Sequence, residues 1–171
     1  LNWNELADVF YKKLYGKLPA DEDRYLNPLK LAEELKATFG RSVLDKILLD
    51  YLPDQEYEPS DIHKKMVRLP WNNIFTTNYD TLLERATKNS EQRYDFVINQ
   101  KDLVYSKMPR IVKLHGSFPS SKPFIISEED YRTYPKRYQL FVNTVQQALV
   151  ENTLCLIGFS GDDPNFLHWI G

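Results

Sequence analysis

Short apolar segments alternate with helix-like segments throughout the second half of the chain, and this alternation constrains the fold more than any other feature. The strand-like segments are residues 73–77, 94–98, 110–114, 123–126 and 153–157. Helix-like segments lie at 79–88 and between 127 and 149. Chains that alternate in this way build α/β folds, in which helices cover both faces of a parallel sheet. We therefore expect an α/β fold with a doubly wound, mostly parallel sheet.

The last apolar segment, residues 153–157, is almost uninterrupted by polar side chains. Such a run is typical of a strand that is buried on both faces of a parallel sheet. Upstream of it, Ser127 opens a sequence that resembles a capping box, and Pro135 is expected to interrupt the helix that follows. Downstream of it, Asp162 or Asp163 is expected to start a last helix.

The first 70 residues place their apolar side chains at helical spacing, which predicts a helical lobe. Asn27 followed by Pro28 predicts the start of one helix, because asparagine caps helices and proline suits their first position. Gly40 predicts its end. Ser42 is expected to cap the next helix.

A chain of 171 residues has the length of one domain. We divide it into a helical lobe, residues 1–70, and an α/β part, residues 71–171. The acidic segment 54–58 lies in the lobe beside prolines and is expected to be a solvated surface loop.

Charge, hydropathy and cysteine content exclude several classes of protein. The formal net charge is −2, so the chain lacks the basic character of a protein that binds nucleic acid directly. No apolar run approaches the roughly 20 residues that span a bilayer, and no signal peptide opens the chain, so we expect a cytoplasmic protein without a membrane partner. One cysteine, Cys155, excludes intramolecular disulfides and cysteine-rich zinc sites.

Polar residues follow three of the expected strands, at the sheet edge where α/β proteins bind their ligands. These turns are Thr76–Asp80, His115–Ser117 and Gly158–Asp163. Each also has a purely structural interpretation. Asn78 or Asp80 would cap the following helix, His115 would be a hydrogen-bonded core histidine, and the glycines would only shape turns.

Taken together and in this order, the three turns resemble the NAD-binding domain of sirtuins. Thr76-Thr77-Asn78-Tyr79-Asp80 matches the family's Thr-x-Asn-x-Asp segment, His115-Gly116 matches its catalytic His-Gly, and Gly158-Phe159-Ser160 matches its Gly-x-Ser. The resemblance implies that Asn78 and His115 are catalytic. It also implies NAD-binding residues, which are Thr76, Thr77, Asp80, Gly116, Gly158, Phe159 and Ser160.

Two further segments narrow the resemblance. Pro70-Trp71 and Ser127-Glu128-Glu129-Asp130-Tyr131 look like the sirtuin-like domains of bacterial anti-phage defence proteins, which consume NAD. The four-cysteine zinc module of protein-deacylating sirtuins has no counterpart here, so no metal is expected. The family's Gly-Ala-Gly-x-Ser loop is also absent, and we expect residues 1–171 to be a domain fragment that lacks this first glycine-rich strand and loop.

The resemblance implies an NAD⁺ nucleosidase that takes NAD as its substrate, releases nicotinamide and ADP-ribose, and acts in abortive infection. A histidine with the ordinary pKa near 6.5 can serve as the base at neutral pH, and Asn78 can orient a ribose hydroxyl and a water. The alternatives are an NAD-dependent protein deacylase or ADP-ribosyltransferase, and a module that senses NAD or ADP-ribose without turnover. The expected partners are further domains or subunits, a phage-derived or partner-protein trigger, and other copies of the chain in a homo-oligomer.

Overall fold

The computed structural model describes residues 3–20, 27–119, 124–158, 163, 166 and 169. Within these ranges the α-helices are α1 (Trp3–Tyr15), α2 (Pro28–Phe39), α3 (Arg41–Tyr51), α4 (Asp61–Met66), α5 (Leu82–Ala86), α6 (Glu128–Arg137) and α7 (Gln139–Glu151). The 3₁₀ helices are η2 (Asp54–Glu56), η3 (Thr87–Asn89) and η4 (Gln100–Val104). The strands are β1 (Asn73–Thr76), β2 (Asp95–Val97) and β3 (Arg110–Lys113).

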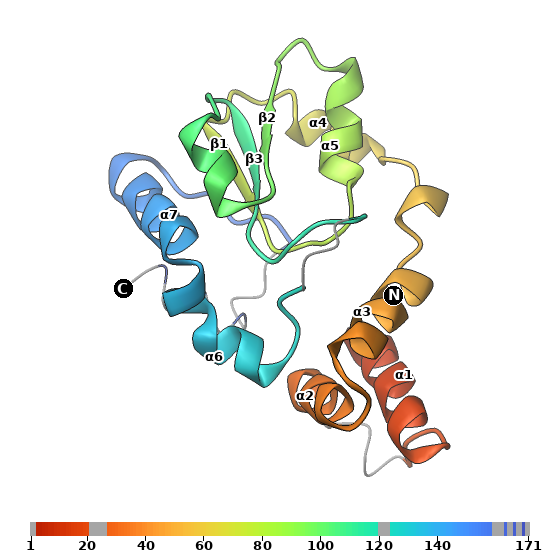
Figure 1. The fold of residues 1–171 in the computed structure, drawn as a ribbon. Helices are drawn as coiled ribbons and strands as arrows, with labels where there is room; N and C mark the ends of the chain where they lie inside the picture. Colours follow the sequence, from red (N-terminus) through yellow and green to blue (C-terminus); the bar gives the residue numbers. More distant parts are fainter. Residues whose placement is uncertain are drawn as a thin grey trace.

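The strands form a parallel sheet in the order β1-β3-β2, in which Ile111 of β3 pairs with Ile74 of β1 and Phe96 of β2. Side chains alternate between the two faces of a strand. Ile111 packs with a cluster that includes residues of α5, whereas Val112 packs with residues of α6 and α7. Figure 1 shows α7 on one side of the sheet and α5 on the other. Helices thus cover both faces, and the expectation of a doubly wound α/β fold is confirmed.

Helices α1, α2 and α3 pack together in the predicted lobe of residues 1–70, whereas the residues after α4 pack with α5 and the sheet, as Val67 does with Ala86 and Ile111. Asn27 caps α2, because its Oδ1 accepts a hydrogen bond from the Leu29 N–H at 2.9 Å. Gly40 ends α2 with φ of 87°, a conformation that favours glycine. The prediction for Ser42 is wrong, because α3 begins directly after Gly40 and Ser42 lies inside the helix.

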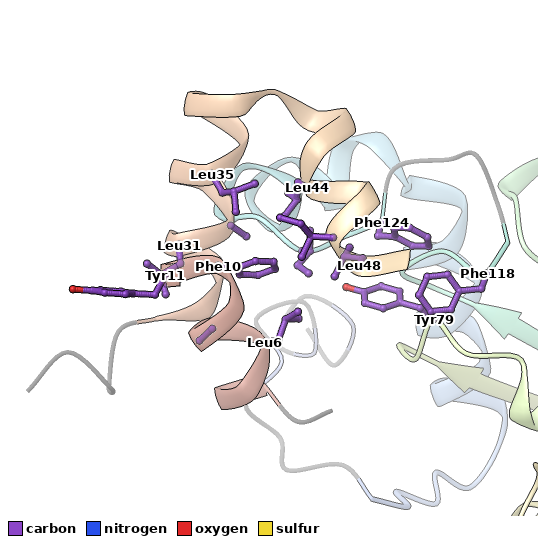
Figure 2. Close-up of a cluster of buried hydrophobic side chains, with 14 residues drawn as sticks. Leu6, Phe10, Tyr11, Leu31, Leu35, Leu44, Leu48, Tyr79, Phe118 and Phe124 are labelled. Carbon is purple, nitrogen blue, oxygen red and sulfur yellow. The ribbon is translucent and has the colours of Figure 1, made fainter. Parts of the chain in front are cut away.

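The core of the lobe continues into the turns that follow β1 and β3 (Figure 2). Tyr79 and Phe118 belong to the same buried cluster as Phe10, Leu35 and Leu48 of the lobe. The lobe therefore packs directly against the carboxyl end of the sheet, where the candidate residues lie.

Two expected strands do not form. Residues 153–157 pair with no strand in the described part of the chain, and Leu154 and Leu156 are about half exposed, at 49% and 51%. A strand forms only where a neighbour supplies the hydrogen bonds of a ladder, and among the described strands none pairs with the outer edge of β1. The described residues 124–126 are buried by side-chain packing but form no strand. Their backbone contact with the segment after β3 is the hydrogen bond from the Ile125 N–H to the His115 carbonyl, at 3.1 Å.

Ser127 and Asp130 form the capping box predicted for α6, with the Asp130 N–H donating to Ser127 Oγ at 3.3 Å. Pro135 does not interrupt α6, which continues to Arg137. Pro135 lacks the N–H that would donate to the Tyr131 carbonyl, and the helix ends two residues later, at Arg137. The helix expected from Asp162 or Asp163 onward falls largely outside the described residues, and none of the described helices is long and apolar enough to cross a membrane.

Candidate functional site

The turn from β1 to α5 carries the first group of predicted residues. Thr76 Oγ1 accepts a hydrogen bond from the Asn78 N–H at 3.1 Å, and Asp80 Oδ1 accepts one from the Leu82 N–H at 3.1 Å. Asp80 therefore supports the start of α5, as the structural interpretation predicted. The Asn78 side chain is exposed and makes no hydrogen bond to any residue in the described part of the chain. Its amide can offer both donors and an acceptor to a ligand.

Tyr79 anchors the same turn in the helical lobe (Figure 2). Its ring lies 5.0 Å from the ring of Phe124, and its hydroxyl donates to the Ile125 carbonyl at 2.6 Å. Burial raises the pKa of Tyr79 well above its ordinary value, so the hydroxyl remains a donor. The backbone carbonyl of Tyr79 accepts from the Phe118 N–H at 2.9 Å, which ties the turn after β1 to the turn after β3.

Asp54 holds the far end of the turn. Its Oδ1 accepts from the Thr81 N–H at 2.7 Å, and its Oδ2 accepts from the Thr81 hydroxyl at 2.6 Å. Arg85 of α5 donates to the Asp54 backbone carbonyl at 2.7 Å. The expectation of a solvated loop is therefore wrong at Asp54, which is buried, although residues 55–58 are exposed. The helical lobe thus fixes the turn through a buried carboxylate that satisfies the N-terminus of α5.

His115, the second predicted catalytic residue, is 2% exposed. The rings of Tyr131 and Tyr134 lie 5.3 Å and 5.5 Å from its ring, and its Nε2 lies 3.9 Å from Asp163 Oδ2. Burial lowers the pKa of His115 to about 3, against a smaller opposing effect of Asp130. The expectation of an ordinary pKa near 6.5 is therefore wrong. The imidazole is neutral throughout the physiological pH range.

Gly116 follows with φ of 100°, in the left-handed region that side chains rarely adopt. A Cβ at this position would lie 3.2 Å from Cδ1 of Phe124. The Tyr134 hydroxyl donates to the Leu114 carbonyl at 2.8 Å, just before the turn. Close packing from both sides therefore defines the path of the chain around His115.

A cavity of about 570 Å³ runs along the open edge of β1. Its wall brings together most of the predicted residues that the structure describes, namely Thr76, Thr77, Asn78, Asp80 and Gly158. Its size is typical of small-molecule sites. His115 and Gly116 do not line it, although Trp169 does, and the Trp169 ring lies 6.2 Å from the ring of His115. Phe159 and Ser160 lie outside the described residues.

Sequence reasoning missed three residues that shape this region, Asp54, Lys113 and Trp169. Lys113 ends β3 directly after the buried Ile111 and Val112 and is itself 1% exposed, so a cation next to an apolar pair was the signal that could have found it. Asp54 and Trp169 carried no such signal. Within the described ranges, no three His, Cys, Asp or Glu side chains gather as potential metal ligands.

Comparisons with known proteins agree on one family. The model of the SIR2-like domain matches residues 72–171. The NAD(+) hydrolase ThsA of Acinetobacter baumannii (strain 532279) is 31% identical over 169 residues, which is 96% of this chain and 34% of that protein. ThsA of Bacillus cereus (strain MSX-D12) is 29% identical over 96% of this chain and 35% of that protein. Defense-associated sirtuin 2 of Bacillus subtilis is 27% identical over 98% of this chain and 17% of that protein. The chain thus spans about a third or less of the length of these relatives.

Proposed function

The chain belongs to the SIR2-like domain family, and from this premise we propose that it is the NAD⁺-hydrolysing module of a bacterial anti-phage defence protein. The module would release nicotinamide and ADP-ribose from NAD⁺. One observation carries the proposal: a single cavity at the carboxyl end of β1 gathers Thr76, Thr77, Asn78, Asp80 and Gly158, which come from two of the three motif segments. The names of the relatives, NAD(+) hydrolase and defense-associated sirtuin, support the same reaction.

The chemistry requires little acid catalysis. Nicotinamide leaves C1′ of the ribose as a neutral molecule from a cationic ring, so the site must hold the sugar and stabilise an oxocarbenium-like transition state, as in glycoside hydrolysis. We assign to Asn78 the orientation of a ribose hydroxyl and the attacking water, because its amide both donates and accepts and is not engaged within the described structure. The negative charge of Asp80 favours the developing positive charge on the ribose.

The neutral state of His115 sets its part in this reaction. A neutral imidazole accepts a hydrogen bond through one ring nitrogen. His115 would therefore orient the water or a ribose hydroxyl, and would not act as a base that is partly protonated at neutral pH. Because the transition state is dissociative, most of the barrier is overcome before the proton has to leave the nucleophile. His115 would be reached from the cavity beside Trp169, whose ring packs against it.

The remaining predicted residues complete the proposed NAD site. Thr76, Thr77 and Gly158 belong to the cavity wall, and we assign them to the dinucleotide. We assign Gly116, Phe159 and Ser160 to the same ligand on the resemblance of their segments to the sirtuin pattern.

We further propose that residues 1–70 and 71–171 act as lobe and NAD-binding part of one domain, which a glycine-rich strand and loop from outside these residues completes. The open edge of β1 offers unpaired backbone groups to such a strand. The exposed apolar segment 153–157 borders the same cavity, so the added strand would have this segment as its second neighbour. A strand in this position would carry its glycine loop to the carboxyl end of β1, where amide groups can meet the pyrophosphate.

In the complete protein, we propose that this module works in the cytoplasm as part of a homo-oligomer, with further domains that receive a phage-derived or partner-protein trigger. The length of the relatives supports the presence of such domains, since the chain covers 34% of one and 17% of another. The trigger would act on the NAD site through the lobe, which holds the β1–α5 turn at Asp54 and Tyr79.

Product analysis tests the proposed reaction. The complete protein would be incubated with NAD⁺ and an acetylated peptide, with and without lysate from phage-infected cells, and the products separated by mass spectrometry. We expect equimolar nicotinamide and ADP-ribose. Formation of O-acetyl-ADP-ribose would identify a deacylase instead, and calorimetric binding of NAD⁺ without nicotinamide release would identify a sensor.

A further inference from the structure

Lys113 is a buried cation at the end of β3, and lysine is almost never fully buried without a partner. It lies one residue beyond Val112, so its side chain shares the α5 face of the sheet with Ile111. Two residues further along the chain stands His115. Lys113 also pairs in register with Thr76, the last residue of β1. The Lys113 side chain therefore lies at the carboxyl ends of β1 and β3, where the segments that carry Asn78 and His115 begin.

The Lys113 ammonium has two partners on the opposite segment. It donates to the backbone carbonyl of Asp80, and it lies 3.2 Å from Glu84 Oε1 on α5. Both carboxylate oxygens of Glu84 are buried and make no hydrogen bond within the described structure, so Lys113 supplies their compensating charge. Removing one member of a buried pair is strongly destabilising, because the other charge remains without compensation.

We propose, on the basis of the proposed function, that Lys113 is a positioning residue that fixes the Asn78-bearing turn to the strand that carries His115. The helical lobe holds this turn at Tyr79 and, through Asp54, at Thr81. Lys113 adds a side-chain link from the end of β3, at Asp80, to the backbone bond between the Phe118 N–H and the Tyr79 carbonyl. Its ammonium thus joins the Asn78 segment and the His115 segment into one unit of defined geometry. Small displacements of such groups lower rates steeply.

The test compares three variants of the complete protein. Lys113→Met leaves Glu84 buried without its partner. Lys113→Met/Glu84→Met removes both charges and replaces them with side chains of similar length, a change that is often neutral for stability. Arg132→Met is the matched control, because Arg132 forms an exposed ion pair with Glu129 on α6, away from the cavity wall. Each variant is measured for Tm, for kcat and KM of nicotinamide release, and for hydrogen exchange of the amides of residues 78–82.

For the single variant we expect a lowered Tm together with slow turnover. In the double variant Tm recovers, but kcat stays about 10- to 100-fold below wild type with a smaller change in KM, because the Asp80 carbonyl still lacks its donor. The amides of residues 78–82 exchange at least about 10-fold faster in both variants, whereas Arg132→Met changes none of these quantities.

The exchange measurement does not depend on the reaction. If the amides of residues 78–82 exchange at the wild-type rate in the double variant, the positioning role is overturned, whatever the wild-type protein does to NAD⁺. Faster exchange in a protein whose wild type releases no nicotinamide supports the positioning role and contradicts the proposed function. A double variant with faster exchange but wild-type kcat contradicts the link between this geometry and turnover.

Discussion

Asn78 and Tyr79 are neighbours in the chain, yet Asn78 is exposed at the cavity while Tyr79 is buried in the core of the helical lobe. The buried ring holds the backbone from which the polar amide projects. The position of a proposed catalytic group therefore depends on the packing of the first 52 residues or so, which contribute no motif of their own.

Tyr79→Phe tests this anchor. The substitution keeps the ring but removes the 2.6 Å hydrogen bond to the Ile125 carbonyl, so the buried carbonyl loses its hydroxyl donor. We expect the free energy of unfolding to fall by about 1–2 kcal/mol in urea titrations. Tyr57→Phe, at an exposed position, is the control and should change stability by less than about 0.5 kcal/mol. Equal stability of the two variants would show that the hydroxyl contributes nothing to the anchor.

The neutral state of His115 predicts how stability depends on pH. Asp130 and Asp163 act on the imidazole from α6 and from the segment after residue 158, and Tyr131 and Tyr134 pack beside it. Burial outweighs the acidic neighbours and lowers the folded-state pKa to about 3, whereas the unfolded value is near 6.5. The unfolded state therefore binds the proton more readily, and this group makes stability rise with pH between about 3 and 6.5 and then level off.

We expect His115→Gln to flatten this dependence. The contribution of His115 to the slope should reach up to about 1.4 kcal/mol per pH unit in the steep range, measured as the difference between wild type and variant in denaturant titrations from pH 7 to pH 4. A His115→Gln profile parallel to wild type would place the imidazole in contact with water.

Gly116→Ala tests the turn after β3. The backbone has φ of 100°, and the new Cβ would lie 3.2 Å from Phe124 Cδ1, so either the turn or the phenyl ring has to shift. We expect a loss of about 1–3 kcal/mol of stability, measured by thermal or chemical unfolding. Gly16→Ala is an informative comparison, because Gly16 also has a positive φ but has open space around its Cβ position. Equal losses at both sites would mean that backbone strain alone, without the Phe124 contact, sets the effect.

The alternation of elements was enough to predict the α/β class and the helical lobe, because apolar spacing and caps are local properties. Asn27, Gly40 and Ser127 act as predicted for the same reason. The prediction of a strand at residues 153–157 failed, because a strand forms only when a neighbouring strand supplies its hydrogen bonds. The sequence pattern does not show that none of the described strands pairs with the outer edge of β1. α6 likewise continues for two residues past Pro135, although proline lacks the N–H for its own helical hydrogen bond.

At the site, motif order led us to expect that the three turns meet in one crevice; Asn78, Asp80 and Gly158 line the cavity, whereas His115 and Gly116 do not. It did not predict the pKa of His115, because that value depends on burial by Tyr131, Tyr134 and other distant residues. Nor did it predict that Asp54, in an acidic loop, accepts hydrogen bonds from the backbone N–H and the hydroxyl of Thr81. These contacts join residues that are 16 (His115 and Tyr131) to 27 (Asp54 and Thr81) positions apart, and local composition carries no record of them.

The rate of nicotinamide release by Asn78→Ala in the complete protein tests the central claim most directly. Asn78 is exposed and makes no hydrogen bond within the described part of the chain, so the variant should keep the Tm of wild type. Asn89→Ala, at an exposed position on η3 away from the cavity wall, is the matched control and keeps full activity. We predict that Asn78→Ala lowers the rate by at least about 100-fold with an unchanged Tm. A wild-type rate in Asn78→Ala would contradict the assignment of this cavity as the site of NAD⁺ hydrolysis.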